Sequence, residues 1–292
     1  MTTTRRWLTA TLTALVVAGM TLLVAPGAQA ATKAQLFVGW LPSYAVSTTT
    51  VKFTGEVYPA AGQKVRVQRR DGSRWVTVDT ATVSRSTAKF SVAYKAKPGT
   101  KKFRLLVAAG GGASSTSRTW TTRTTDGVKY KKYIAKARSY MKAYCPKEPI
   151  YINTPPVKAP GAVVGLATET YYGTSSRTTW VHEIHIQAGL SPALLRHVAL
   201  HECAHVVQYR RLVKGATYRA KAEKATAKVY GTSVGTANEM QADCMAIVIT
   251  HKSQYGGYTH SCGGKRGDSA RALWKAWGKK YQKPVYTFAT KK

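Results

Sequence analysis

Acidic side chains are scarce in this sequence: 12 Asp and Glu stand against 45 Lys and Arg in 292 residues. They form no cluster that could hold structural calcium, which needs several oxygen ligands. Cysteine is scarce too, and four residues are too few for a disulfide-dense scaffold. A hydrophobic content of 44% excludes a disordered chain. The length favours two domains, each with its own core.

No apolar run after residue 30 is long enough to span a membrane. Before that point, Arg5 and Arg6 precede an apolar run from Trp7 to Val24, and Ala28-Gln29-Ala30 follows it. We therefore predict a signal peptide over residues 1–30, cut after Ala30, and a secreted extracellular protein with no transmembrane segment after cleavage. An uncleaved anchor is the alternative, but the Ala-x-Ala site favours cleavage. Export makes disulfides feasible.

The charge is basic along the whole chain. Without Arg5 and Arg6, 43 basic residues face 12 acidic ones, a formal charge of +31, and both 31–127 and 128–292 carry an excess of Lys and Arg. Such a surface concentrates polyanions, so an anionic cell-wall polymer is a candidate partner. A basic surface that only aids solubility and wall retention is the plainer interpretation. No nucleic-acid motif accompanies the charge, so no specific nucleic-acid recognition is expected.

Residues 31–127 are predicted to form an all-β sandwich. Apolar and polar residues alternate in short runs separated by turn residues, which is typical of half-buried strands. The runs are 51–57, 64–68, 74–79, 89–93, 102–107 and 117–121. A Val-x-Val-Gln strand, a turn at Asp71-Gly72 and a strand from Trp75 resemble the Ig-like modules of exported bacterial enzymes. We expect Trp75 and Trp120 to be core or edge aromatics.

Residues 128–292 are predicted to form a mainly helical α+β domain. Apolar residues at helical spacing indicate helices over 128–144 and 269–281, a Lys- and Ala-rich helix spans about 218–229, and short strands are expected at 149–152 and 178–186. Ser191 and Pro192 supply an N-cap and a first-turn proline for a long helix that reaches about Leu212.

That long helix contains His201-Glu202-Cys203-Ala204-His205. Residues four apart share one helix face, so the two imidazoles can bind one metal ion while Glu202 holds a water. Zinc hydrolases use this pattern, with the Glu as general base. A catalytic zinc needs a third protein ligand. Glu239 and Asp243 are again four apart, so one can ligate while the other accepts the outer N–H of a ligand histidine.

His201-Glu202-x-x-His205 followed by Asn238-Glu239-x-x-x-Asp243 resembles the gluzincin class of metallopeptidases, and residues 239–244 are similar to a segment of bacterial neutral zinc metallopeptidases. The resemblance spans about 177–250. It implies a zincin-like domain with two antiparallel motif helices and one Zn2+ per chain. It also implies His201, His205 and Glu239 as ligands, Glu202 as the catalytic base and Asp243 as the outer partner.

Other residues have lesser claims to a site. His197 lies one turn before His201 and could border the cleft, but a ligand role is not favoured. His182 and His185 stand in a predicted strand, where they face opposite sides and cannot easily share an ion. That strand, 178–186, is expected beside the cleft, where a peptide could pair with it. Candidate oxyanion stabilisers are Tyr255, Tyr258 and His260.

All four cysteines fall after residue 128, and they allow three pairings. Cys203 points away from the predicted metal face, so a disulfide suits it better than ligation. We favour Cys244–Cys262 with Cys145–Cys203.

These patterns predict a secreted zinc metalloendopeptidase, a hydrolase that cleaves peptide or protein substrates with a zinc-activated water and Glu202 as general base. Two rivals remain open. One is a non-catalytic wall-associated protein in which zinc is a structural staple. The other is a protein whose main function is to bind polyanions through its basic surface.

Overall fold

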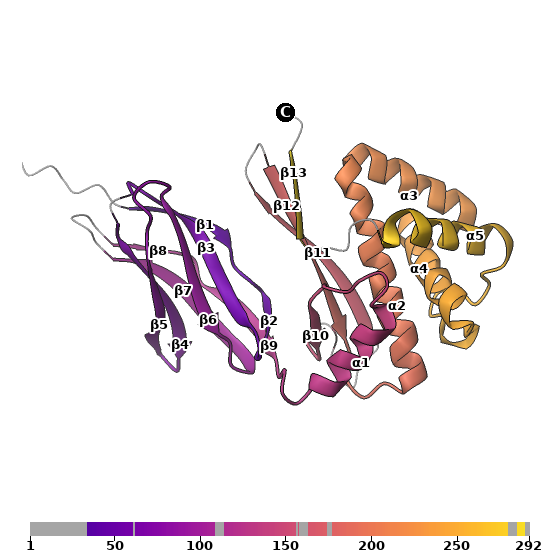
Figure 1. Ribbon diagram of the computed structural model, residues 1–292, viewed down its shortest axis with the longest axis horizontal. Helices are drawn as coiled ribbons and strands as arrows, with labels where there is room; N and C mark the ends of the chain where they lie inside the picture. The colour runs from indigo at the N-terminus through magenta and orange to yellow at the C-terminus, as the bar shows by residue number, and fades with distance from the viewer. Residues whose placement is uncertain are drawn as a thin grey trace, which may run out of the picture.

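The computed structural model describes residues 34–60, 62–108, 114–155, 157, 163–173, 177–279 and 285–289. The predicted signal peptide over 1–30 lies outside these residues. A β-rich region with three sheets precedes a helical region in the chain. Figure 1 shows three successive regions, namely a pair of sheets, a further sheet and a group of helices.

The N-terminal part consists of two sheets over one core. Their strand orders are β1-β3-β6 and β2-β9-β7-β4-β5, with β8 paired to β7. Phe53, Phe103 and Trp120 join the sheets, because their ring centroids lie 5.3–5.9 Å apart. Trp75 lies on β5 with the Arg104 guanidinium over its ring. The strands are β1 (Gln35–Trp40), β2 (Tyr44–Val46), β3 (Thr50–Tyr58), β4 (Lys64–Asp71), β5 (Arg74–Thr82), β6 (Lys89–Lys95), β7 (Gly99–Val107), β8 (Ser115–Thr116) and β9 (Trp120–Thr125).

The strand expected over 117–121 is wrong in its bounds. Residues 117–119 belong to no strand, and only Trp120 and Thr121 lie in β9. Ser117 explains the late start of β9, since its Oγ accepts the Leu105 backbone N–H at 2.8 Å. A side chain that replaces a backbone acceptor in this way competes with the regular strand ladder.

The second part begins with a mixed sheet. Its strands are β10 (Ile150–Ile152), β11 (Gly165–Gly173), β12 (Arg177–Ile186) and β13 (Val285–Ala289). β12 is central, since β11 pairs with one side and β10 and β13 pair with the other. The expectation that a peptide could pair with 178–186 is therefore wrong, because both edges of β12 are occupied. β11, which the sequence pattern does not predict, is the strand at the end of the sheet order.

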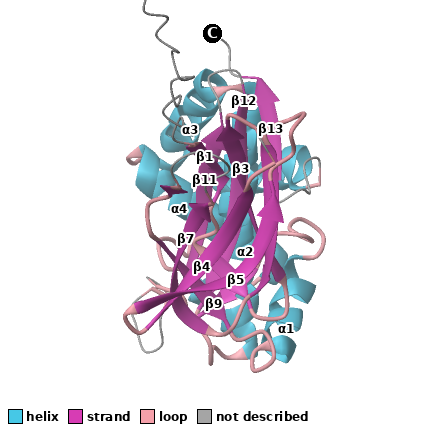
Figure 2. Cartoon of the chain, turned by 90° about the vertical axis from the view of Figure 1, so that its left-hand side faces the viewer, coloured by secondary structure: helices cyan, strands magenta, loops and turns pink. Residues whose placement is uncertain are grey.

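One helix, α1 (Lys131–Met141), precedes this sheet in the chain. The helices after β12 are α2 (Pro192–Tyr209), α3 (Ala216–Tyr230), α4 (Val234–Thr250) and α5 (Gly264–Leu273), and a π-helical turn follows over Trp274–Gly278. α2 contacts both β11 and β12, and α4 packs on α2. Viewed from the sandwich side, Figure 2 shows the strands in front and the helices behind them.

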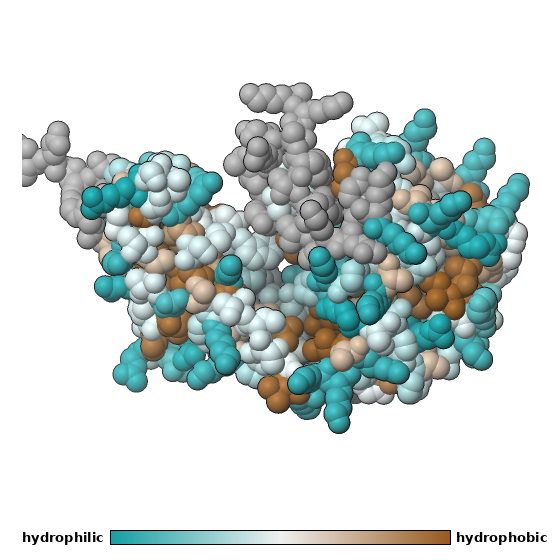
Figure 3. All heavy atoms as spheres, viewed as in Figure 1, coloured by the Kyte–Doolittle hydropathy of each residue, from teal (hydrophilic) through white to brown (hydrophobic). Residues whose placement is uncertain are grey.

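Within the described residues, no helix combines the length and apolarity needed to cross a bilayer. The visible surface agrees with the excess of Lys and Arg. Figure 3 shows hydrophilic side chains projecting from both the sandwich and the helical part.

Candidate metal centre

Helices α2 and α4 carry the residues of the two sequence motifs. Each helix begins at a serine whose Oγ accepts a backbone N–H of the first turn, from Leu194 to Ser191 at 3.3 Å and from Thr236 to Ser233 at 3.4 Å. These caps fix where each helix starts. Because the helices pack on each other, they bring residues 201–205 next to residues 239–243.

Three side-chain atoms converge between the two helices. His201 Nε2 and His205 Nε2 lie 3.1 Å apart, and Glu239 Oε2 lies 3.3 Å from the first and 3.0 Å from the second. The histidine side chains are 12% and 9% exposed, whereas that of Glu239 is 33% exposed. The group is thus buried on its helix side and accessible beside Glu239.

This triangle has the dimensions of a metal site. Tetrahedral ligands about 2.0–2.1 Å from a zinc ion stand about 3.3–3.4 Å from one another. The three observed separations approach that value, and two imidazole nitrogens with one carboxylate are a donor set used for catalytic zinc. Three protein donors would leave a fourth tetrahedral position for solvent or substrate.

Asp243 lies beside His201 on the side away from Glu239 and His205. Its Oδ1 lies 2.8 Å from His201 Nδ1, and its Oδ2 accepts the backbone N–H groups of Tyr258 and Thr259 at 2.7 and 3.0 Å. The carboxylate is 1% exposed. It therefore holds His201 in the tautomer that turns Nε2 toward the triangle, which is the role of an outer partner.

Gln208 is the corresponding outer partner of His205, a role that was not predicted from the sequence. Gln208 Oε1 lies 2.9 Å from His205 Nδ1, while its Nε2 donates to Asn238 O at 2.9 Å and to Gln241 Oε1 at 3.2 Å. The available signal was its place in α2, three residues after His205 and hence on the same face.

Glu202 lies on the β11 side of the site. It is 5% exposed and hydrogen-bonds with the backbone of Ala167. A Cβ built on Gly165 would overlap Glu202 Oε1, so the strand runs directly over the carboxylate. Burial raises the pKa of Glu202, although His201 and His205 oppose the shift. A carboxylate with a raised pKa can take up a proton and return it.

The Glu239 carboxylate stays ionised. Burial would raise the pKa of Glu239, but hydrogen bonds with His201 and His205 outweigh burial and lower it to about 2. Burial would lower the pKa of His201, but hydrogen bonds with Asp243 and Glu239 raise it to about 10. Both shifts show that the carboxylates favour positive charge at this point, as binding of a divalent cation requires.

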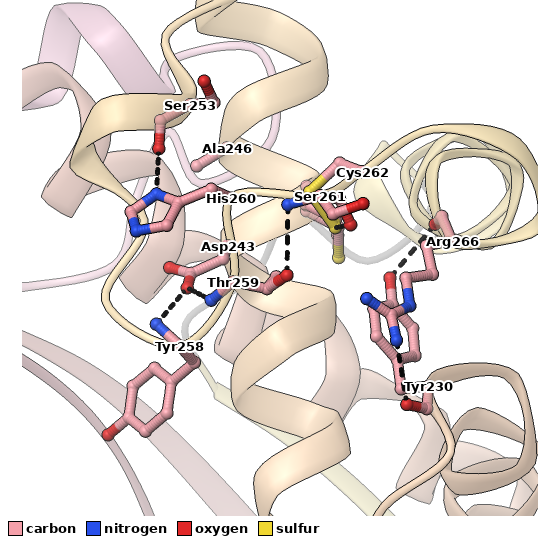
Figure 4. Close-up of a disulfide and its surroundings, with 12 residues drawn as sticks. Tyr230, Asp243, Ala246, Ser253, Tyr258, Thr259, His260, Ser261, Cys262 and Arg266 are labelled. Atoms are coloured by element: carbon pink, nitrogen blue, oxygen red, sulfur yellow. Dashed lines mark hydrogen bonds between the residues drawn. A yellow bond between two sulfur atoms is a disulfide. The ribbon is translucent and has the colours of Figure 1, made fainter.

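The loop after α4 brings one of the three expected oxyanion stabilisers to the site. The Tyr258 ring stacks on His201 with the centroids 6.3 Å apart, and Glu239 is the main cause of its raised pKa. Tyr255 lies beside His197 instead, with the two ring centroids 6.2 Å apart. His260 instead has its Nδ1 2.6 Å from Ser253 O, as Figure 4 shows.

His197 forms a second set with His201 and Asp243. One atom from each lies within 4.8 Å of the others, and His197 Nε2 is 3.5 Å from Asp243 Oδ1. This set would use His201 Nδ1, which Asp243 already engages at 2.8 Å, a hydrogen-bond distance. The triangle of His201, His205 and Glu239 is therefore the better metal site.

The two strand histidines contact different neighbours. His182 Nε2 is 3.5 Å from Glu169 Oε1, and His185 Nδ1 is 2.6 Å from Thr154 Oγ1. Both disulfides favoured from the sequence are present, Cys145–Cys203 and Cys244–Cys262. The second bridges α4 to the loop that holds Asp243 (Figure 4).

Fold and site together define a two-helix, three-donor candidate metal centre beside a mixed sheet. No family model matches the chain, and no curated protein matches it. Among solved structures, extracellular domains 3–5 of Drosophila OTK show 8% sequence identity and a TM-score of 0.22, over 56% of this chain and 66% of that chain. This chain thus covers slightly less than two thirds of that structure. A likeness this weak carries no conclusion about function, which has to be inferred from the site.

Proposed function

We propose that this protein is a secreted zinc-dependent peptidase, in which a zincin-like domain of gluzincin type follows an Ig-like module. The observation that carries the proposal is the triangle of His201, His205 and Glu239 with Glu202 beside it. The two disulfides fit export, because such bonds persist in oxidising compartments.

The residues around the triangle have separate tasks in peptide hydrolysis. Zinc, when bound, supplies a Lewis acid that polarises the scissile carbonyl and acidifies water. Glu202 takes the proton of the attacking water and returns it to the leaving amine, a transfer that its raised pKa favours. Asp243 and Gln208 orient the ligand histidines. Tyr258 is the candidate donor to the developing oxyanion.

Replacement of the proposed base tests this function. Glu202→Gln should keep one zinc per chain and lower turnover of a quenched peptide library by about 100-fold or more, since general-base catalysis contributes on that order. His201→Ala should lose both zinc and activity. Glu56→Gln, a change in the sandwich, is the control and should alter neither. Metal analysis and peptide hydrolysis are the measurements, and full activity of Glu202→Gln would refute the mechanism.

A further inference from the structure

We propose that the Cys244–Cys262 disulfide is a site of thiol–disulfide exchange, through which a dithiol reductant weakens zinc binding. The bridge ties α4 to the loop that follows it, and Cys244 comes directly after Asp243 in α4. The inference concerns regulation of the candidate metal centre, so it rests on the proposed function.

The loop that the bridge holds acts on His201 in two ways. Asp243 Oδ2 accepts the backbone N–H groups of Tyr258 and Thr259 at 2.7 and 3.0 Å, and Asp243 Oδ1 lies 2.8 Å from His201 Nδ1. The Tyr258 ring also stacks on His201, with the centroids 6.3 Å apart. Figure 4 shows the two backbone donors, Asp243 and the disulfide in one view. A change in the loop therefore reaches a ligand histidine through a carboxylate and through a ring.

The bridge is the covalent part of the link between this loop and α4. His260 Nδ1 lies 2.6 Å from Ser253 O, a contact within the loop that does not reach the helix. Among the hydrogen bonds of the described residues, those that join residues 256–262 to α4 are the two to Asp243. Without the disulfide, these two bonds alone would keep the loop against the carboxylate, and outer partners of this kind support metal affinity.

This disulfide is also the more accessible of the two. Cys145 and Cys203 are both 0% exposed, whereas Cys262 is half-buried and lies between the exposed residues Ser261 and Gly263. Exchange begins when a thiolate attacks one sulfur of the bridge, so access decides which disulfide reacts. A reductant should therefore reach Cys262 while the other bridge stays intact.

The reaction is complete with a dithiol as the reductant. One thiolate of the dithiol attacks Cys262 Sγ, a mixed disulfide forms, and the Cys244 thiolate leaves and is protonated. The second thiolate of the dithiol then attacks its own sulfur in the mixed disulfide and releases Cys262. The dithiol becomes a disulfide, and this chain gains two electrons and two protons.

Graded reduction of the whole protein with dithiothreitol, followed by alkylation, tests the site. Mass spectrometry should find Cys244 and Cys262 alkylated before Cys145 and Cys203. After the reagents are removed, competition with a zinc chelator should show an affinity about tenfold or more below that of the untreated protein. A reduced sample that is reoxidised instead of alkylated should recover its affinity. These measurements need no peptide hydrolysis, so a lack of peptidase activity would not be mistaken for failure of the exchange site.

Serine variants supply the matched controls. Cys244→Ser with Cys262→Ser should bind zinc weakly from the start and should not respond to dithiothreitol. Cys145→Ser with Cys203→Ser should respond as the parent does. The proposal is overturned if Cys145–Cys203 is reduced first, if reduction of Cys244–Cys262 leaves zinc affinity unchanged, or if the first variant still responds. A parent protein that binds no zinc would overturn the metal centre and this inference together.

Discussion

At the scale of single residues, Gly165 lies where a side chain would displace the proposed base. A Cβ at this position would overlap Glu202 Oε1 and would also approach Val198. Gly165→Ala should therefore shift the Glu202 carboxylate, lowering kcat/KM at least about tenfold while zinc content stays at one per chain. Peptide hydrolysis and metal analysis measure the two effects.

A second glycine serves as the control for that substitution. A Cβ on Gly235, in the first turns of α4, meets nothing within 4 Å. Gly235→Ala should leave hydrolysis unchanged. Equal losses in the two variants would mean that the effect of Gly165→Ala does not act through Glu202.

Gln208 is a positioning residue that acts through His205. Gln208→Met keeps the length of the side chain but removes the acceptor for His205 Nδ1 and the donor to Asn238 O. Loss of such an outer partner typically costs about 10–100-fold in metal affinity. Competition with a zinc chelator should show a decrease of this size. Unchanged zinc affinity in a folded variant would exclude this role.

At the scale of elements, the two disulfides should differ in what they stabilise. Cys145–Cys203 closes a loop of 58 residues and Cys244–Cys262 one of 18. Loop-closure entropy then predicts losses of about 4 and about 3 kcal/mol in unfolding free energy for the paired Cys→Ala variants. Urea denaturation measures both losses.

The two disulfide variants should rank differently in zinc affinity than in stability. Removal of Cys244–Cys262 loosens the loop whose backbone N–H groups hold Asp243 Oδ2, so this variant should bind zinc more weakly. Cys145–Cys203 involves none of the groups that hydrogen-bond to Asp243 in the part of the chain that the structure describes, so its removal serves as the comparison. If the Cys145–Cys203 variant lost more zinc affinity, the loop would not be what holds Asp243.

At the scale of the whole molecule, the sandwich and the second part share a polar boundary. Tyr44 OH donates to Pro155 O at 3.1 Å, the Tyr44 ring lies 4.4 Å from that of His185, and Thr125 Oγ1 accepts the Ile152 N–H at 2.8 Å. Beside them, Glu183 is 4% exposed and accepts from Tyr151 OH at 3.4 Å. Burial raises the pKa of Glu183 to about 7.

This buried carboxyl should make stability depend on pH. The folded state holds the proton up to about pH 7 while the unfolded chain loses it near pH 4.5, so stability falls as the pH rises between these values. Burial lowers the pKa of His185 to about 4, which has the opposite effect between pH 4 and 6.5. Glu183→Gln isolates the first contribution. At pH 8 this substitution should raise the unfolding free energy by about 3 kcal/mol more than it does at pH 4.

Denaturant unfolding at the two pH values checks this prediction. Asp268→Asn, at an exposed position of α5, should change neither value by a comparable amount. An equal effect of Glu183→Gln at pH 4 and pH 8 would show that Glu183 does not carry the pH dependence.

Local pattern was sufficient for much of the fold and the site. The turn at Asp71-Gly72, the N-cap at Ser191 and the four-residue spacing of His201 and His205 are short-range features, set by backbone geometry and helix periodicity. They located most of the sandwich strands, the long helix and the candidate ligands. The strand over 117–121 was misplaced because the Ser117 side chain bonds to the backbone of β7, a contact between separated segments that local pattern does not encode.

Only the tertiary structure decided which separated segments meet. β11 carries Thr, Glu and Gly along its length and gave no clear strand signal, yet it lies over Glu202 and occupies the edge that we had assigned to β12. The contacts of Gln208 with Asn238 and Gln241 depend on how α4 packs on α2, which the spacing within α2 does not encode. The sequence by itself determined which donor side chains share a helix face, because this depends on residues within one turn. The convergence of His201, His205 and Glu239 depends on how α2 packs on α4, and packing is a property of the whole chain.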